Sequence, residues 1–253
     1  MNDRRRLMTL APPLLAALMY GSPALAATPG EPDPAAATAD ATATAGAAET
    51  GPNALRPTGA ETVPSGQETP MGRDERDAVQ VVNRFWERNW SRHFPGAYTP
   101  PKVRGRYDPA DPPTCGDVRL EPGNAYYCPA GDYLTWDGDF VKGDPELEGN
   151  AFTYITIAHE WGHAIQHRTH TLSGPTAKIE LQADCLAGAT LTGARDEGHL
   201  EWEPLDEERL LTAIASIGDD LPETDPDHHG SPEDRVTAFL TGEQGVRACM
   251  SRP

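Results

Sequence analysis

The chain is poor in positive charge. It has 21 lysine and arginine residues against 39 aspartate and glutamate residues, so its formal net charge is −18 at pH 7. Binding to nucleic acid and docking on anionic lipid both need a basic face, because the partner's phosphates are negative. The composition therefore argues against a nucleic-acid partner and against charge-driven membrane docking. A net charge of this size can instead keep an exported protein soluble.

Long apolar runs are also missing. The mostly apolar stretch from Leu7 to Tyr20 contains two prolines and is too short for a membrane-spanning helix. It follows Arg4-Arg5-Arg6 and precedes Ala24-Leu25-Ala26, an order that is typical of a cleaved export signal. We therefore expect residues 1–26 to be a signal peptide of the Sec or twin-arginine type, with no stable membrane insertion after its removal.

Proline and glycine, in contrast, are plentiful, and most of the excess lies before residue 70. Residues 27–70 consist mainly of Ala, Thr, Pro, Gly and Glu without apolar periodicity. Such a segment buries too little apolar surface to offset the entropy that is lost on ordering. We expect a disordered spacer over residues 27–70 and one folded domain over residues 71–253, which is long enough for a hydrophobic core.

Cysteine is scarce. The chain has four cysteines and no C-x-x-C spacing, which argues against a thiolate zinc site. In an exported protein, four cysteines suggest two disulfides, for which three pairings exist. Cys115 and Cys128 flank the predicted strand region and form a natural local pair. Cys185 would then tie its helix to Cys249 near the end of the chain.

Apolar periodicity predicts an α+β domain that is mostly helical and has a small β region. A first helix begins near Asp74 and ends before Pro95, with apolar residues at three- and four-residue steps. The segment from Asn124 to Trp136, with a turn at Pro129–Asp132, is typical of two short strands. Further helices are expected over about 151–168, 176–193, 206–216 and 232–240.

The helix expected over residues 151–168 contains the pattern H-E-x-x-H, in His159-Glu160-Trp161-Gly162-His163. Residues four apart stack on one face of a helix, so both imidazoles can bind the same ion. Glu160 is displaced around the helix axis and can reach a metal-bound water without occupying a coordination position. The alternative is a helix that merely carries two surface histidines.

A catalytic zinc ion (Zn2+) needs at least one more protein ligand. The metzincin pattern would place Gly three residues and His six residues past His163, but Gln166 and Thr169 occupy these positions. His167 lies a full helical turn beyond His163, and His170 is misplaced by one residue. We expect both of these histidines to lie in a solvated helix end.

Glu180 is the better candidate for the third ligand. It lies near the start of the next helix, which a short Gly-Pro linker turns back against the histidine face. Asp184 lies four residues further on, shares that face, and could accept the free ring N–H of a ligating histidine. Two histidines, one glutamate and a supporting aspartate make a gluzincin-type site, with the ligand set of thermolysin.

Several separated segments resemble the putative neutral zinc metallopeptidases of bacteria. The resemblance runs from about Val79 to Cys249, and the segments in order are Asn83–Trp86, Cys115–Gly116, Asn124–Pro129, Ala158–Gln166, Glu180–Gly188 and His229–Val236. It implies a zincin-like metallopeptidase domain, peptidase-like zinc chemistry, and Glu180 at the family's acidic position. The long spacer and the acidic stretch 219–227 depart from the family.

The sequence thus predicts an exported zinc metallopeptidase that hydrolyses peptides or proteins through a zinc-activated water, with Glu160 as general base. His229 is a candidate for stabilising the oxyanion, and Arg235 is the second. The alternative for this segment is a helix start that Ser231 caps, with Arg235 paired to a carboxylate. Two other classes stay open: a non-catalytic zinc-binding protein of the envelope or medium, and a zinc amidase that acts on cell-wall amide bonds.

Overall fold

The computed structural model describes residues 55–58, 71–222 and 228–250. The predicted signal peptide and most of the predicted spacer lie outside the described residues. Within the expected spacer range, β1 (Arg56–Pro57) pairs antiparallel with β7 (Leu200–Glu201). The boundaries of the signal, the spacer and the domain stay predictions.

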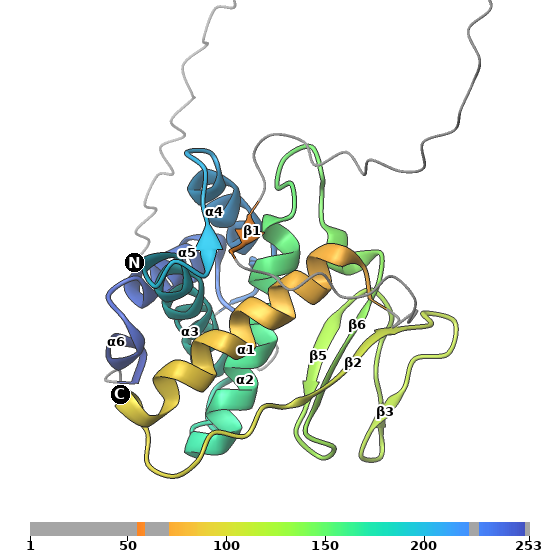
Figure 1. Cartoon of the computed structure of the whole chain (residues 1–253). Helices are drawn as coiled ribbons and strands as arrows, with labels where there is room; N and C mark the ends of the chain where they lie inside the picture. Colours follow the sequence, from red (N-terminus) through yellow and green to blue (C-terminus); the bar gives the residue numbers. More distant parts are fainter. Residues whose placement is uncertain (1–54, 59–70, 223–227, 251–253) are drawn as a thin grey trace, which may run out of the picture. The chain divides into compact units, whose positions relative to one another are not determined.

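Helices make up about half of the described residues, and the α+β class is confirmed (Figure 1). The helices are α1 (Arg73–His93), α2 (Ala151–Thr169), α3 (Thr176–Asp196), α4 (Asp206–Ser216), α5 (Pro232–Gly242), α6 (Val246–Met250) and a 3-10 turn, η1 (Phe140–Lys142). The first five coincide with the helices that the apolar periodicity predicts, and their ends differ by a few residues. α6 and η1 are not predicted, because a few residues are too short for a periodic pattern.

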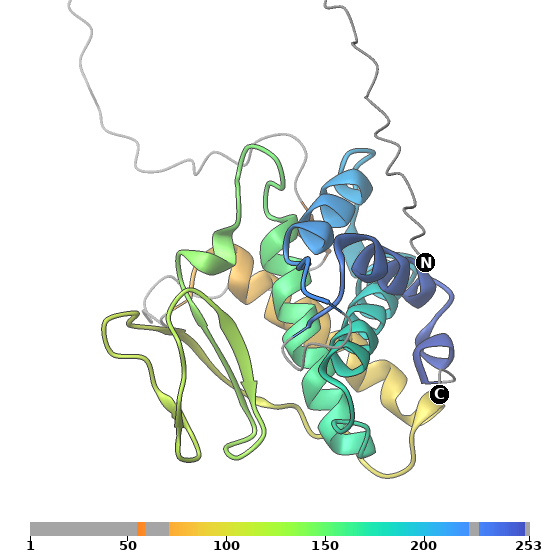
Figure 2. The same ribbon diagram turned by 180° about the vertical axis from the view of Figure 1, so that it is seen from behind.

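A three-stranded sheet lies beside α1 and α2 (Figures 1 and 2). Its strand order is β2 (Lys102–Tyr107), β6 (Tyr133–Asp137) and β5 (Ala125–Cys128). The predicted strand region forms β5 and β6, which are antiparallel, whereas β2 runs parallel to β6. Among the described residues, β5 is therefore an edge strand. A small hairpin joins β3 (Thr114–Cys115) to β4 (Val118–Arg119).

α2 is the central helix of the domain. Of its 19 residues, 15 are buried, and it contacts α1, α3, α4 and β5. A helix that is apolar on nearly every side buries itself against several neighbours at once. Buried polar groups on such a helix cost free energy unless they are paired. Packing alone therefore does not explain why the polar residues His159, Glu160 and Gln166 are buried on α2.

Gly162, between the two histidines of α2, allows α3 to approach closely. A Cβ added at Gly162 would lie 3.0 Å from the Ala183 carbonyl oxygen and 3.1 Å from the Ala183 Cα, closer than ordinary van der Waals contact. Ala183 lies on α3, one turn after Glu180. The contact between these helices thus brings the start of α3 to the histidine face of α2.

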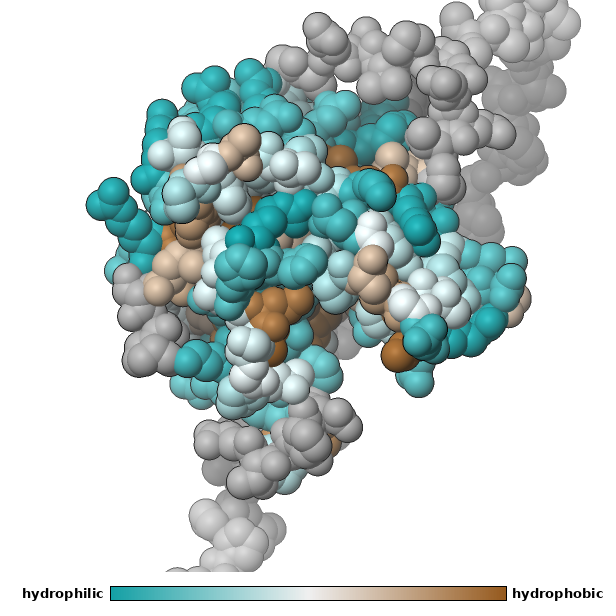
Figure 3. Space-filling view, turned by 90° about the horizontal axis from the view of Figure 1, so that it is seen from below, coloured by the Kyte–Doolittle hydropathy of each residue, from teal (hydrophilic) through white to brown (hydrophobic). Residues whose placement is uncertain are grey.

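Two disulfides close the fold. Cys115–Cys128 joins β3 to β5, and Cys185–Cys249 joins α3 to α6, which are the pairings that the sequence predicts. Such bridges persist in oxidising compartments and are compatible with export. Among the helices of the described residues, none is both long enough and apolar enough to cross a bilayer. The face shown in Figure 3 is largely hydrophilic, in keeping with the high net charge.

Candidate metal centre

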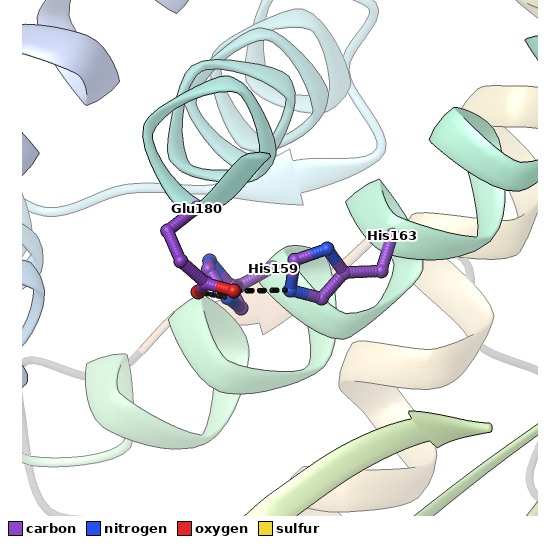
Figure 4. Close-up of side chains that lie close together, drawn as sticks. All are labelled: His159, His163 and Glu180. Carbon is purple, nitrogen blue, oxygen red and sulfur yellow. Dashed lines mark hydrogen bonds and ion pairs between the residues drawn. The ribbon is translucent and has the colours of Figure 1, made fainter. Parts of the chain in front are cut away.

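α2 presents His159 and His163 one turn apart, toward the start of α3 (Figure 4). The two ring centroids are 4.7 Å apart, and the ring planes are nearly perpendicular, at 86°. His159 is buried and His163 is nearly so. The four-residue spacing places both rings on one helix face, with an Nε2 atom of each directed at the same carboxylate.

That carboxylate belongs to Glu180, which extends from α3 toward both rings (Figure 4). Its Oε2 lies 3.1 Å from His159 Nε2, and its Oε1 lies 3.4 Å from His163 Nε2. One ligand atom from each of the three residues lies within 4.8 Å of the others. Tetrahedral zinc with bonds of about 2.0–2.2 Å separates neighbouring ligand atoms by about 3.3 Å. The three groups therefore fit a zinc ion in both chemistry and spacing.

The remaining ring nitrogen of His159 faces Asp184, which is fully buried on α3. His159 Nδ1 lies 2.7 Å from Asp184 Oδ1. The guanidinium of Arg235, from α5, donates to the same oxygen at 2.8 Å and to the Ile217 carbonyl at 2.9 Å. When Nδ1–H donates to a carboxylate, Nε2 keeps the lone pair that a metal ligand needs.

The remaining ring nitrogen of His163 faces a neutral group, Gln166. His163 Nδ1 lies 2.8 Å from Gln166 Oε1, and the Gln166 side chain is completely buried. Gln166 has no role in the site that the sequence predicts. The signal was available in its spacing, because a residue three positions after a histidine lies on the same face of a helix.

The metal-ligand candidates line a cleft of about 660 Å³. Glu160, the predicted general base, lies on its wall and is 8% exposed. Residues 123–127, which include most of the edge strand β5, form another part of the wall. The cleft thus combines a buried carboxylate, a possible metal site and an edge strand.

His229 also lines this cleft. Its side chain is half exposed, and its Nδ1 lies 3.3 Å from Asp219 Oδ2. Asp219 further accepts hydrogen bonds from the His229 backbone N–H at 2.8 Å and from His228 Nδ1 at 2.9 Å. Burial raises the pKa of Asp219, but these hydrogen bonds outweigh it and hold the pKa well below its usual value. His229 is therefore held beside a carboxylate that stays ionised.

The other candidate side chains are paired or lie outside the donor group. Arg235 is bound to Asp184, and Ser231 caps α5 by accepting from the Asp234 backbone N–H at 3.2 Å. A capped helix start with Arg235 paired to a carboxylate is the alternative that the sequence offers to an oxyanion role for Arg235. His167 and His170 are exposed near the C-terminal end of α2, as their spacing predicts.

Comparison with known proteins bears on the nature of this site. A family model described as putative neutral zinc metallopeptidase matches residues 40–248. The chain belongs to this family. Two curated relatives, each described as uncharacterized protein YpfJ, come from Escherichia coli strain K12 and from Escherichia coli O6:H1 strain CFT073. Each is 31% identical over 159 residues, which is 54% of this chain and 49% of the relative.

The chain thus spans about half the length of the curated relatives it matches. No solved structure matches the chain. Membership of the zinc metallopeptidase family implies zinc as the ion, and the group formed by His159, His163 and Glu180 is a possible place for it.

In the metal-free protein, the three candidate ligands interact with one another. Burial lowers the pKa of His159, but Asp184 and Glu180 outweigh it and raise the pKa to about 10. Burial also opposes the charged form of His163, but the hydrogen bond that its ring donates to Glu180 raises its pKa. For Glu180 burial acts in the opposite direction, and the two histidines hold its pKa well below the usual value.

We expect zinc to stabilise the protein more strongly as the pH rises. His159 has a raised pKa in the folded state, so its contribution to the metal-free fold is complete below 6.5 and is lost as the pH approaches about 10. Zinc binds the deprotonated ring, so the competing proton leaves over the same range. Melting temperatures measured with zinc and with a chelator should therefore diverge between about pH 6.5 and 8.5. A difference that stays constant over this range would contradict the expectation.

Proposed function

We propose that the chain is an exported zinc metallopeptidase that hydrolyses peptide bonds in the cleft between α2, α3 and β5. One observation carries the proposal: Glu160 and the three convergent donor groups of His159, His163 and Glu180 line the same cleft. A purely structural zinc site is usually closed by four protein ligands. A set of three donors with a separate carboxylate beside it suits catalysis better.

Each residue in this proposal has a distinct task. His159, His163 and Glu180 hold the ion, and Asp184 orients His159. Zinc held by these residues would supply a Lewis acid for the scissile carbonyl and would lower the pKa of a water toward about 7. Glu160 accepts the proton of the attacking water on its carboxylate and delivers it to the nitrogen of the leaving amine.

The wall of the cleft favours an extended peptide as the substrate. β5 has a partner strand on one side only among the described residues, and its residues line the cleft. An edge strand offers backbone N–H and C=O groups to a further strand, so a peptide can bind by strand addition. Apolar side chains at Phe140, Leu172 and Ile217 add surface for the side chains of the substrate.

The location outside the cytoplasm is part of the proposal. The two disulfides support it, because such bridges are rare in reducing compartments. The predicted Sec or twin-arginine signal over residues 1–26 would direct the chain there.

His229 is proposed to stabilise the oxyanion that forms during hydrolysis. It lines the cleft, is half exposed and is held by Asp219. Replacement of His229 with alanine should lower kcat by about 10²-fold with little change in zinc content. His170→Asn is a suitable control, because His170 is exposed and lies in a left-handed conformation that asparagine accepts. Full turnover in His229→Ala would remove this role.

A cleavage screen tests the proposed function. The mature protein is incubated with a peptide library, a casein-like protein and purified peptidoglycan, each with zinc and with a chelator. We expect cleavage of peptides that chelation abolishes and added zinc restores. If peptidoglycan were the only substrate cleaved in the presence of zinc, the protein would be a cell-wall amidase and not a peptidase. Zinc binding without cleavage of any substrate would support a non-catalytic role.

A further inference from the structure

Gln166 occupies an unusual position for a glutamine. Its side chain is completely buried at the interface between α2 and α3, yet both protons and the oxygen of its amide are hydrogen-bonded. Oε1 faces His163 Nδ1 at 2.8 Å, and Nε2 donates to the Ile179 carbonyl at 2.7 Å and to Gln182 Oε1 at 3.0 Å. A buried amide in which both protons and the oxygen are paired is held in one orientation.

The Ile179 carbonyl decides which orientation this is. A backbone carbonyl only accepts hydrogen bonds, so the amide of Gln166 must point its nitrogen at Ile179. If the amide were rotated by 180°, two oxygens would face each other at the present distance of 2.7 Å. The oxygen of Gln166 is therefore directed at His163, which must donate from Nδ1. That state of the ring leaves Nε2, the atom directed at Glu180, free to bind a metal.

A second carbonyl gives the chain of hydrogen bonds the same direction. Gln182 Nε2 donates to the carbonyl of Cys249 at 3.2 Å, which turns Gln182 Oε1 toward Gln166. Cys249 lies on α6 and is bonded to Cys185 of α3. The series from His163 through Gln166 and Gln182 therefore ends on backbone that a disulfide ties to the same helix that carries Glu180.

We infer that Gln166 is a positioning residue for the metal site: it fixes the donor state of His163 and, through Ile179, holds the start of α3 against it. The amide of Gln166 thus binds both His163 and the carbonyl of Ile179, the residue before Glu180. This inference rests on the proposed function insofar as His163 and Glu180 are taken as zinc ligands. It assigns His159 and His163 different supports, one a carboxylate backed by Arg235 and the other a neutral amide backed by two carbonyls.

Zinc affinity tests this role directly, without reference to turnover. The metal-free, disulfide-intact protein is titrated with zinc in competition with a chromophoric chelator. Gln166→Met preserves the approximate volume of the side chain but removes all three hydrogen bonds. We expect zinc to bind about 10–100-fold more weakly, the range found when the outer partner of a ligating histidine is lost. Gln182→Met removes the acceptor for Gln166 and the hydrogen bond to the Cys249 carbonyl but leaves the contact between Gln166 and His163, so it should weaken zinc binding by less.

The double variant Gln166→Met/Gln182→Met and one control separate positioning from general loss of stability. If the two residues act in one series, their effects on zinc affinity are less than additive. Thr190→Val is the matched control, because Thr190 is also fully buried on α3 and loses a hydrogen bond to the Leu186 carbonyl. It should lower the free energy of unfolding and leave zinc affinity unchanged.

The outcomes are distinguishable. Unchanged zinc affinity in Gln166→Met, with tight binding to the unmodified protein, would overturn the role of Gln166 and leave the proposed function intact. Gln182 is less buried than Gln166, so Gln182→Met serves as the test if Gln166→Met does not fold. Unchanged zinc affinity in Gln182→Met would then overturn the proposed role of this chain of hydrogen bonds. Failure of the unmodified protein to bind zinc would overturn both the inference and the proposed function. An equal loss of affinity in Thr190→Val would show that packing alone is responsible.

Discussion

Replacement of Glu160 with glutamine is expected to abolish peptide hydrolysis while zinc stays bound. Glutamine has nearly the same size and shape, so the cleft and the three donor groups should be unchanged. It cannot accept the proton of the attacking water, and a positioned general base contributes about 10²–10⁴-fold to the rate. The loss is expected mainly in kcat, because the substitution alters proton transfer and not the surfaces that bind the peptide.

The measurement pairs initial rates on a cleaved peptide with zinc content after dialysis. Glu233→Gln, an exposed carboxylate in the first turn of α5, serves as the control for the same chemical change and should retain activity. Glu160→Gln with unaltered turnover would remove the general-base assignment. Loss of both zinc and activity would instead move Glu160 into the group that holds the metal.

Replacement of Glu180 with alanine is expected to remove the metal. Only His159 and His163 would then remain of the three convergent donors, and two protein ligands are fewer than catalytic zinc sites have. The loss of affinity should exceed the roughly 10–100-fold that follows from the loss of an outer partner. Activity should fall with occupancy and recover in part at high zinc concentration.

Zinc content after dialysis and the zinc concentration needed for half-maximal activity measure this effect. Asp196→Ala is the control, because Asp196 is exposed and lies at the other end of α3. This variant should bind zinc normally. If Glu180→Ala retained one tightly bound zinc per chain, the third ligand would have to be another residue. Glu160 would then be the acidic candidate, because its side chain lines the same cleft as the two histidines.

Much of the helical framework is predictable from the sequence because its signals are local. The apolar steps of α1 and α2, and the Gly-Pro break before α3, specify each helix within its own residues. The parallel pairing of β2 with β6 is not predictable in this way, because strands that pair in parallel need a long connection and leave no turn signal. The pairing of β1 with β7 joins segments more than a hundred residues apart, with two residues in each.

The same distinction between local and long-range signals applies to the candidate site. His159, Glu160 and His163 follow from spacing on one helix, and Glu180 follows from the short turn to the next helix. The partner of Asp184 does not follow, because Arg235 comes from α5, 51 residues further along the chain. Gln166 occupies a position where the metzincin pattern requires glycine, so that pattern gives it no role. Its function depends on the Ile179 carbonyl, which no side-chain pattern encodes.

Anomalous diffraction from crystals of the zinc-loaded protein tests the central claim most directly. We expect one strong peak at the zinc absorption edge, about 2.0–2.2 Å from His159 Nε2, His163 Nε2 and a carboxylate oxygen of Glu180. His163 Nδ1 should remain within hydrogen-bonding distance of Gln166 Oε1, as it is in the present structure. A peak bound by other side chains, or no peak in crystals soaked in zinc, would contradict the assignment of this cleft as the metal centre.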